Sequence, residues 1–363
     1  MPKLTFVAGA RYAAWQDLDA WNESDIDRNA GRFRSGVDVW IVQTYLHVRD
    51  VLAADGWTVR LSDRFEAGAI AVAHWDELHR PRWRAPLSYL IGVRADRPPV
   101  LAADKVVRQN TLSPDDAGTI GIAPWPQPGM KPRRPERGDM VKRVGYFGRM
   151  AQAPSFFSDP AFRAELAALG LEFVPSEHDW QDYSEIDVVI AFRTAPPSLL
   201  RHKPVSKVSN AWLAGAPAIV GPEPAYLQLR QSEHDMRVAN DAPGVIAELT
   251  RLVNDRAFYA AMRARAAERA QEFDVPALRD RWVAFFRERV APAFAQWRAR
   301  DASTARRYAW YVEAMLAERI AAKRYRAKIR REQAAMGSHA SAEAAGIAVQ
   351  DAMTQSPLRP PAR

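Results

Sequence analysis

The stretch "NAWLAGAPAIVGPE", from Asn210 to Glu223, decides the fold class of this chain. It begins as an apolar run with helical spacing, stops at Gly215, and continues as the strand-like run "APAIVG" before ending on Gly-Pro-Glu. A glycine commonly follows the last turn of a helix, and a short apolar run is consistent with a buried strand. The stretch therefore predicts a helix that leads directly into a strand, as in α/β proteins.

The same alternation extends toward the N-terminus. Apolar, β-rich runs predict strands at "VDVWIVQTY" (37–45), "WTVRLS" (57–62), "AGAIAVAH" (67–74) and "SYLIGVRA" (88–95), with a helix at "LHVRDVLAADG" (46–56). Continuous apolar runs suit the strands of a parallel sheet that is covered on both faces. We therefore expect the first half of the chain to be Rossmann-like.

A proline-rich interruption separates this half from a second one. Residues 123–138 contain five prolines, which disfavour a regular helix or a central strand, so we interpret them as an interdomain linker. Strands are then predicted at 141–150, 171–176 and 186–193, with helices at 160–170, 243–255 and 276–297. This pattern indicates a second Rossmann-like domain followed by a long helix.

These patterns divide the chain into seven parts. They are an N-terminal segment of undecided structure (1–34), an N-terminal Rossmann-like domain (35–122), the linker (123–138), a C-terminal Rossmann-like domain (139–276), a crossing helix (277–300), a basic amphipathic helix (301–335) and a tail predicted to be disordered (336–363). The disorder is predicted because the tail has few large apolar residues.

Composition excludes several classes of protein. The chain has no cysteine, so it has no disulfide, cysteine nucleophile or thiolate zinc site. Its formal charge is +8, but residues 301–332 alone carry nine Lys or Arg against four acids, which disfavours a nucleic-acid binder whose basic surface covers the whole protein. No apolar run is long enough to cross a bilayer and no signal peptide is evident, so we expect a cytoplasmic protein.

Candidate binding residues follow two predicted strands of the second domain. In "YFGRM", Gly148 lets the backbone approach a ligand, and Arg149 offers a cationic fork to a phosphate. In "RHKPVSKVSNAWLAG", Lys203, Lys207 and Ser209 lie near the start of the predicted helix, where free N–H groups attract anions. Both stretches fall where ligands bind in doubly wound sheets, outside the carboxyl ends of the strands.

Each of these residues also has a structural interpretation. Arg149 and the two lysines are consistent with solvated surface charges, and Glu223 with an acid in a surface loop. Ser209 and Asn210 are consistent with caps of the helix start. The structural interpretation explains each residue separately, whereas a ligand site explains why all of them fall at one edge of one domain.

The C-terminal half resembles the GT-B glycosyltransferases of the family-4-like group. "GYFGRM" is similar to the strand, glycine and arginine that open their C-terminal domain, and "KPVSKVSNAWLAGAPAIVGPEPAY" resembles their donor-binding segment. The similarity is best from about 123 to 286 and looks closest to a branch found in bacterial surface-polysaccharide clusters. It implies a GT-B fold, with two Rossmann-like domains facing a central cleft and a C-terminal helix that crosses back onto the first domain.

The resemblance implies a metal-independent, hexosyltransferase-like enzyme without a cofactor, which retains the anomeric configuration. Arg149 and Lys207 would act in catalysis, by neutralising the diphosphate of a nucleotide-sugar donor as the glycosidic bond breaks. The other residues implied to bind the donor are Gly148, Lys203, Ser209, Asn210, Gly215 and Glu223. A glycan or a lipid-linked molecule would be the acceptor, in the synthesis of a bacterial surface polysaccharide or glycoconjugate.

This chain departs from the family pattern at two positions. Typical members carry two glutamates separated by seven residues, and the matching positions here are His202 and Asn210. An inverting enzyme would need a base from the first domain, where His74 and Asp76 of "AHWDEL" are the candidates on the acceptor side. His74 also suits a purely structural role at a strand end.

Other motifs give little support to different chemistry. The acidic pairs "DLD" (17–19) and "DID" (25–27) precede the first predicted strand, so we interpret them as solvated acids and predict no metal site. The chain has no Walker loop, HExxH or GxSxG pattern, which removes the usual support for nucleotide hydrolysis, metalloprotease and hydrolase chemistry.

The basic helix predicted at 305–332 mixes Lys and Arg with aromatic and aliphatic residues. Such a helix suits an anionic membrane surface, with a solvated or partner-binding helix as the alternative. Two other functions stay open at this point. One is a non-catalytic nucleotide- or sugar-binding protein of the same fold, and the other is an adaptor that binds membrane or RNA through the basic helix.

Overall fold

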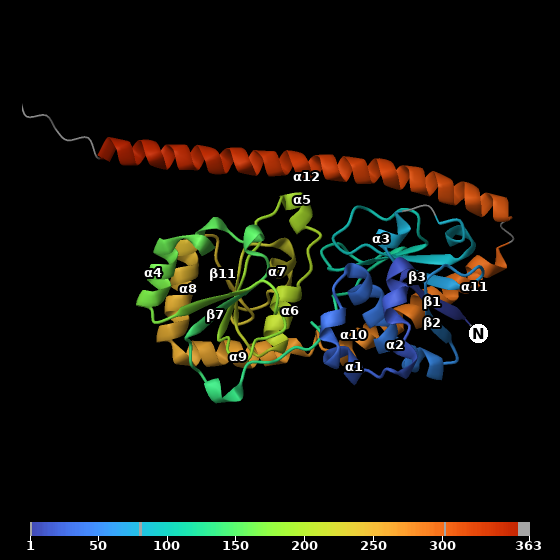
Figure 1. Cartoon of the computed structure of the whole chain (residues 1–363), viewed down its shortest axis with the longest axis horizontal. Coiled ribbons are helices and arrows are strands. Elements are labelled where there is room, and N and C mark those ends of the chain that lie inside the picture. The colour runs from blue at the N-terminus through green and yellow to red at the C-terminus, as the bar shows by residue number, and fades with distance from the viewer. Residues whose placement is uncertain (1, 80–81, 301–302, 355–363) are drawn as a thin grey trace, which may run out of the picture.

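The computed structural model describes residues 2–79, 82–300 and 303–354. These residues form two parallel sheets, with strand orders β2-β1-β3-β4-β5-β6 and β11-β10-β9-β7-β8, and a long helix that runs along both (Figure 1). Every paired strand in both sheets is parallel. The predicted α/β class with two Rossmann-like domains is therefore confirmed.

The first sheet contains the three strand runs predicted between 57 and 95. Its strands are β1 (Lys3–Val7), β2 (Thr58–Ser62), β3 (Ile70–His74), β4 (Tyr89–Val93), β5 (Lys105–Arg108) and β6 (Thr119–Gly121). Its regular helices are α1 (Ser24–Arg28), α2 (Gln43–Ala54) and α3 (Trp75–Leu78). All residues of β3 and β4 are buried, which explains why both appear in the sequence as unbroken apolar runs.

The strand predicted at 37–45 is wrong. Asp38–Val42 forms a π-helical turn that continues into α2, so the whole run is helical. A short apolar run does not distinguish a buried strand from a buried helix. The buried carboxylate of Asp38 favours the helix here, because it accepts hydrogen bonds from the backbone N–H groups of Arg34 (3.1 Å) and Ser35 (2.9 Å) just before the turn.

The first strand instead lies in the N-terminal segment whose structure the sequence left undecided. β1 pairs with β2 on one side and with β3 on the other, so it is an interior strand of the first sheet. Its last four residues are buried. The N-terminal segment is therefore part of the first domain and supplies a piece of its core.

The second sheet confirms the strands predicted at 141–150, 171–176 and 186–193. Its strands are β7 (Arg143–Phe147), β8 (Glu172–Ser176), β9 (Val188–Ala191), β10 (Ala218–Val220) and β11 (Arg237–Val238). Its helices are α4 (Pro160–Ala168), α5 (Pro197–Leu200), α6 (Ser206–Leu213), α7 (Pro224–Leu229), α8 (Ala242–Asn254) and α9 (Arg256–Ala270). Gly215 has φ +74°, a left-handed conformation that lets the chain turn from α6 toward β10 as predicted.

The proline-rich stretch 123–138 contains a single short 3-10 turn, Pro135–Arg137, as regular structure. It is nevertheless fixed to the second domain. The buried carboxylate of Asp187 accepts hydrogen bonds from Arg133 (2.9 Å) and Arg137 (2.7 Å). Buried ion pairs of this kind hold a segment in register because a broken pair would leave a charge without a partner.

After the second domain the chain returns to the first. α10 (Val275–Ala284), a π-helical stretch (Phe285–Val290) and α11 (Ala291–Ala299) form this crossing segment. Phe286 packs edge to face on Phe6 of β1, with ring centroids 6.1 Å apart, and Phe294 packs in the same way on Tyr89 of β4, at 6.0 Å. The crossing helix implied by the sequence resemblance is thus present and covers the first sheet.

The last helix, α12 (Thr304–Thr354), lies along one side of both domains (Figure 1). Glu318 accepts hydrogen bonds from the backbone of Leu101 (2.8 Å) in the first domain, and Glu332 accepts one from the backbone of Ser198 (2.8 Å) in the second. Disorder was predicted from 336, but the helix continues to Thr354; residues 355–363 lie outside the described residues. Within the described part of the chain, we find no helix whose length and hydropathy would let it cross a lipid bilayer.

The crossing segment provides a test of the packing. We expect Phe286→Ala to lower the free energy of unfolding by about 3–5 kcal/mol, because it removes a fully buried ring and leaves a cavity in its place. Glu288→Ala, at an exposed position two residues further along the same π-helical stretch, should change it by less than about 0.5 kcal/mol. Urea denaturation followed by tryptophan fluorescence measures both variants. Equal effects of the two substitutions would contradict the packing described.

Candidate functional site

A cavity of about 1400 Å³ lies between the two domains. Its walls include residues at the carboxyl ends of parallel strands of both sheets: His74 ends β3, Gly148 follows β7, Glu177 follows β8 and Arg193 lies two residues after β9. The carboxyl edges of the two sheets therefore bound one cleft. This is the place at which doubly wound sheets bind ligands.

The second domain contributes cationic groups to this cleft. Arg149, Arg193, Lys203 and Lys207 all line it. Lys207 lies in the first turn of α6, where its Nζ donates a hydrogen bond to the carbonyl of Phe192 (3.4 Å). The cations come from three segments of the sequence that the sheet topology brings to one wall.

Lys207 has an unusual electrostatic environment. Burial, followed by the nearby guanidinium of Arg193, lowers the pKa of Lys207 to about 7. Its ammonium group also lies over the ring of Tyr146, 4.2 Å from the ring centroid, which stabilises the charged form. The cleft thus holds a lysine that changes charge near neutrality, and an anion beside Nζ would favour its protonated state.

Gly148 allows this lysine to stand beside the end of β7. Its φ is +154°, and a Cβ at this position would lie 2.8 Å from Lys207 Nζ. A larger residue would displace the ammonium group from the strand end. The next residue, Arg149, is exposed and lines the same cleft.

Glu223 does not line the cleft. Its side chain is 2% exposed and forms an ion pair with Arg193, which does line it. Burial raises the pKa of Glu223. The sequence suggested that this carboxylate contacts a ligand, whereas the structure places it behind Arg193, where it holds the guanidinium in position.

Arg193 is a cleft residue that sequence reasoning missed. Arg193 lies two residues after the end of the buried strand β9, just as Arg149 lies two residues after the end of β7. The rule that ligand-binding groups follow the carboxyl ends of parallel strands would have found it.

The remaining predicted residues of α6 separate into two groups. Asn210 lines the cleft and is buried, and its Oδ1 has no hydrogen-bond partner among the described residues. Ser209 and Gly215 do not line the cleft; the Ser209 hydroxyl donates to the carbonyl of Ser206 (3.4 Å), and Gly215 follows the far end of the helix. Val205 occupies the cap position, so the alternative that Ser209 and Asn210 cap this helix is wrong.

Lys203 bridges the two domains. Its Nζ forms an ion pair with Asp96 of the first domain at 2.7 Å, and both residues line the cleft. Asn110 of the first domain donates hydrogen bonds to the carbonyls of Arg201 and Lys203, each at 3.0 Å. His202, in the middle of this segment, does not line the cleft and faces a second, smaller cavity instead.

On the wall of the first domain, His74 lines the cleft while its ring is buried. Its Nδ1 accepts a hydrogen bond from the backbone of Asp76 (3.2 Å) at the start of α3, so the structural interpretation has a basis. Its Nε2 has no hydrogen-bond partner in the described ranges, and a Cβ on Gly36 would lie 2.8 Å from it. The ring is therefore fixed on one side and unpaired on the other.

Asp76 does not line the cleft but contacts His74, which does. It accepts a hydrogen bond from Arg97 at 2.9 Å and lies 3.3 Å from His74 Nδ1. Burial alone would raise the pKa of Asp76, but the hydrogen bond with His74 and the charge of Arg97 outweigh it, and the pKa falls to about 2. Asp76 is thus a carboxylate that orients His74.

The acidic pairs near the N-terminus serve local structure. Asp17 pairs with Arg32 (2.7 Å), Asp25 with Arg28 (2.9 Å), and Asp27 accepts a hydrogen bond from the backbone of Gly129 (2.8 Å). Across residues 2–79, 82–300 and 303–337, no group of three or more His, Asp or Glu side chains is arranged to hold a metal ion.

Solved structures similar to this chain include AviGT4, a glycosyltransferase involved in avilamycin A biosynthesis, at a TM-score of 0.49 and 14% identity over 80% of this chain and 99% of that one. Alr3699/HepE of Anabaena, in complex with UDP, has a TM-score of 0.43 and 14% identity over 79% and 99%. TarM has a TM-score of 0.46 and 9% identity over 61% of this chain and 55% of TarM, about half of its length. No protein-family model and no curated protein matches the sequence.

The environment of Lys207 generates a prediction. We expect an amine-reactive reagent such as acetic anhydride to modify Lys207 with a midpoint near pH 7, where its pKa lies. Arg193→Gln removes one of the groups that lower this pKa, so it should move the midpoint toward the usual lysine value of about 10.4. Mass spectrometry of the digested protein gives the midpoint for each lysine, and the other lysines serve as internal references. A midpoint that Arg193→Gln leaves unchanged would contradict the coupling.

Proposed function

We propose that this chain is a glycosyltransferase that moves a sugar from a nucleoside-diphosphate donor to a glycan or lipid-linked acceptor. The observation that carries the proposal is the set of cations, Arg149, Arg193, Lys203 and Lys207, on one wall of an interdomain cleft. A diphosphate is the ligand that such a wall at the carboxyl ends of strands suits best. The cleft is also large enough for a nucleotide sugar and an acceptor together.

The cations would act on the leaving group. As the glycosidic bond breaks, the departing nucleoside diphosphate gains negative charge, so fixed cations stabilise the transition state more than the bound substrate. Lys207 is held beside β7 by the small size of Gly148, and Arg193 by its ion pair with buried Glu223. These contacts orient the two groups before the charge develops, which lowers the cost of reorganisation.

Asn210 would bind a hydroxyl group of the donor. Asn210 lines the cleft, and its buried Oδ1 has no hydrogen-bond partner in the described part of the chain. An unpaired buried oxygen costs free energy that a donor hydroxyl would recover. The neutral amide replaces the carboxylate that the family resemblance led us to expect at this position.

We place the acceptor against the first domain, near His74. We further propose that the anomeric configuration is retained and that the reaction needs no metal. In this arrangement His74, oriented by Asp76, contacts a substrate hydroxyl through Nε2. A general base, which an inverting enzyme would need, requires the other tautomer, in which Nδ1 donates to the Asp76 carboxylate 3.3 Å away and Nε2 is free to accept a proton. The configuration of the product therefore distinguishes the two roles of His74.

The cation wall has a direct test. We expect Arg149→Ala and Lys207→Ala each to lower kcat/KM for transfer by about 100-fold or more, because each removes a group that faces the developing charge. Ser209→Ala, on the same helix but outside the cleft, should have little effect. The donor is first identified by thermal shift against UDP, GDP, CMP and their sugars, since a ligand that binds the folded state raises its stability.

Two readouts of the same assay complete this test. Turnover in EDTA should equal turnover without it, and proton NMR of the product should show the anomeric configuration of the donor. Full activity in the double variant Arg149→Ala/Lys207→Ala would overturn the proposed site. Stabilisation by a nucleotide sugar without transfer to any acceptor would favour the non-catalytic binding protein.

The outward face of α12 supports a site of action at a membrane. Val312, Leu316 and Ile320 lie four residues apart on one exposed face, and the last two are each 55% exposed. Arg319 and Lys323, also exposed, lie beside them. We propose that this face binds an anionic membrane surface, at the inner side of the plasma membrane, where a lipid-linked acceptor would be reached.

The charge balance of α12 favours lipid as the partner. Glu318 and Glu332, which weaken the positive charge in the sequence, turn toward the protein and bond to its backbone. The outward face is therefore more basic than the composition of the helix indicates. Each basic residue near an anionic surface contributes about 1 kcal/mol of attraction.

Vesicle binding tests this face. We expect the protein to sediment with phosphatidylglycerol-containing vesicles but not with pure phosphatidylcholine vesicles, and to be released as salt rises. Leu316→Ser/Ile320→Ser should weaken this association about tenfold or more, since two apolar side chains leave the lipid. Leu227→Ser, an exposed leucine of the second domain, is the matched control. Equal binding of all three proteins, or binding to RNA in preference to vesicles, would contradict the assignment.

A further inference from the structure

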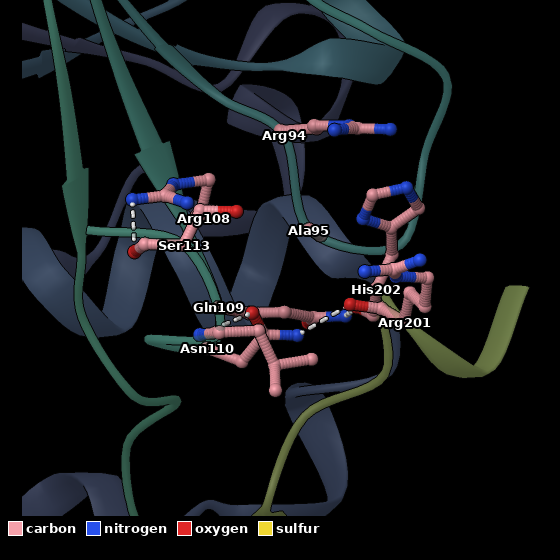
Figure 2. Close-up of a pocket in the computed structure, with 9 residues that line it drawn as sticks. Arg94, Ala95, Arg108, Gln109, Asn110, Ser113, Arg201 and His202 are labelled. Carbon is pink, nitrogen blue, oxygen red and sulfur yellow. Dashed lines mark hydrogen bonds between the residues drawn. The ribbon is translucent and has the colours of Figure 1, made fainter. Parts of the chain in front are cut away.

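A second cavity, of about 100 Å³, lies at the domain junction behind the large cleft. Figure 2 shows the arginine side chains and the histidine that surround it. Arg94 and Arg108 come from the first domain, and Arg201 and His202 come from the second. The cavity is thus closed only when the two domains are together, and its lining contains three arginines and no acid.

The arginines are only partly neutralised. Arg108 lies 3.5 Å from Asp115, but this carboxylate also accepts a hydrogen bond from the backbone of Gly121 (2.7 Å) and lies 3.9 Å from Arg289. The Arg108 Nε is buried without a hydrogen-bond partner among the described residues. The other acceptors of Arg108 are the neutral carbonyls of Ser113 (2.9 Å) and Pro114 (3.0 Å), so the cavity retains positive charge.

The charge of Arg94 is also not neutralised by an acid in this cavity. Arg94 donates to the carbonyl of Arg97 (3.0 Å) and lies over the ring of Tyr325 from α12, 5.8 Å from its centroid. Asp96, the residue that follows the Arg94–Ala95 pair, is held by Lys203 in the large cleft. Arg94 thus meets a carbonyl and an aromatic face, neither of which neutralises its charge.

The histidine that lines this cavity, His202, has a lowered pKa. Burial, followed by the charges of Arg94 and Arg201, lowers the pKa of His202 to about 4. The ring is therefore neutral near physiological pH and offers a donor without adding a fourth positive charge.

The backbone at Ala95 is strained. It has φ +50°, which no other non-glycine residue of the described ranges shares in sign. Ala95 lines both cavities, and its turn directs Arg94 to the small cavity and Asp96 to the large cleft. Strain of this kind persists where surrounding contacts impose it, and it is common at ligand sites. Ala95 thus forms part of the wall between the two cavities.

We propose that the small cavity binds a phosphate group, held by Arg94, Arg108 and Arg201. Its volume equals that of about three water molecules, enough for one phosphate and too small for a nucleotide. Arginine forks match phosphate oxygens with two parallel hydrogen bonds. The phosphate belongs either to a free small molecule or to a lipid headgroup near α12.

Bound phosphate would also fasten the two domains. Arg94 and Arg108 belong to one domain and Arg201 to the other, so an anion between them replaces like-charge repulsion with attraction. The segment that carries Arg201 also carries Lys203 of the large cleft. The proposed site is independent of the chemistry in that cleft but lies against the same interdomain loops.

Calorimetric titration of the full chain with inorganic phosphate tests the proposal. Arg201→Gln, at an exposed position that tolerates substitution, should weaken binding about tenfold or more, and Arg94→Gln should do the same. Arg201→Lys should recover only part of the affinity, because lysine lacks the planar fork. Arg298→Gln, on an exposed part of α11, removes the same charge elsewhere and should leave binding unchanged.

Two further arms separate the possible sources and sites. If phosphate alone does not bind, vesicles containing phosphatidic acid are tested with the same variants, and loss of binding in Arg201→Gln then assigns the site to a lipid headgroup. Loss of phosphate binding in Arg149→Ala/Lys207→Ala but not in Arg201→Gln would place the anion in the large cleft and overturn the proposal. So would equal affinities of the wild type and Arg201→Gln, or no binding to either probe.

Discussion

The return of the chain from the second domain to the first is the constraint on which the rest of the structure depends. The crossing segment follows the second sheet in sequence, yet Phe286 and Phe294 pack on strands β1 and β4 of the first. These aromatic rings are buried there, so the segment that leaves the second domain is fixed on the first sheet. The carboxyl edges of the two sheets border one cavity. The cleft is thus a product of hydrophobic packing far from the residues that line it.

Charge in this protein is held in place by groups that stand behind the ligand-facing residues. Buried Glu223 supports Arg193 from behind the cleft, and Asp76 supports His74 on the other wall. Such supporting groups keep a charged side chain in one rotamer, which is more useful to a binding site than an additional mobile charge. Ala95 lines both cavities, and arginines outnumber lysines in the lining of each.

The sequence predicted what depends on local pattern and missed what depends on tertiary contact. Strands such as β3 and β7 were found because burial on both faces leaves an unbroken apolar run. The run at 37–45 has the same pattern but is helical, and the buried carboxylate of Asp38 binds the backbone N–H groups of Arg34 and Ser35 just before it. At the site, Arg149, Lys207 and Asn210 were placed together by the strand-end rule. The burial of Glu223 behind Arg193 was not predictable, because the pair is 30 residues apart.

α12 has a geometric consequence for motion between the domains. Glu318 is fixed to Leu101 and Glu332 to Ser198, and these two glutamates are fourteen residues apart on one helix. At 1.5 Å per residue the two glutamates are about 21 Å apart along the helix axis, and this distance stays constant while the backbone hydrogen bonds of the helix hold. A hinge motion that changes the span between the two anchor points must release one of them. While both contacts hold, the helix therefore limits how far the cleft between the two domains can open or close.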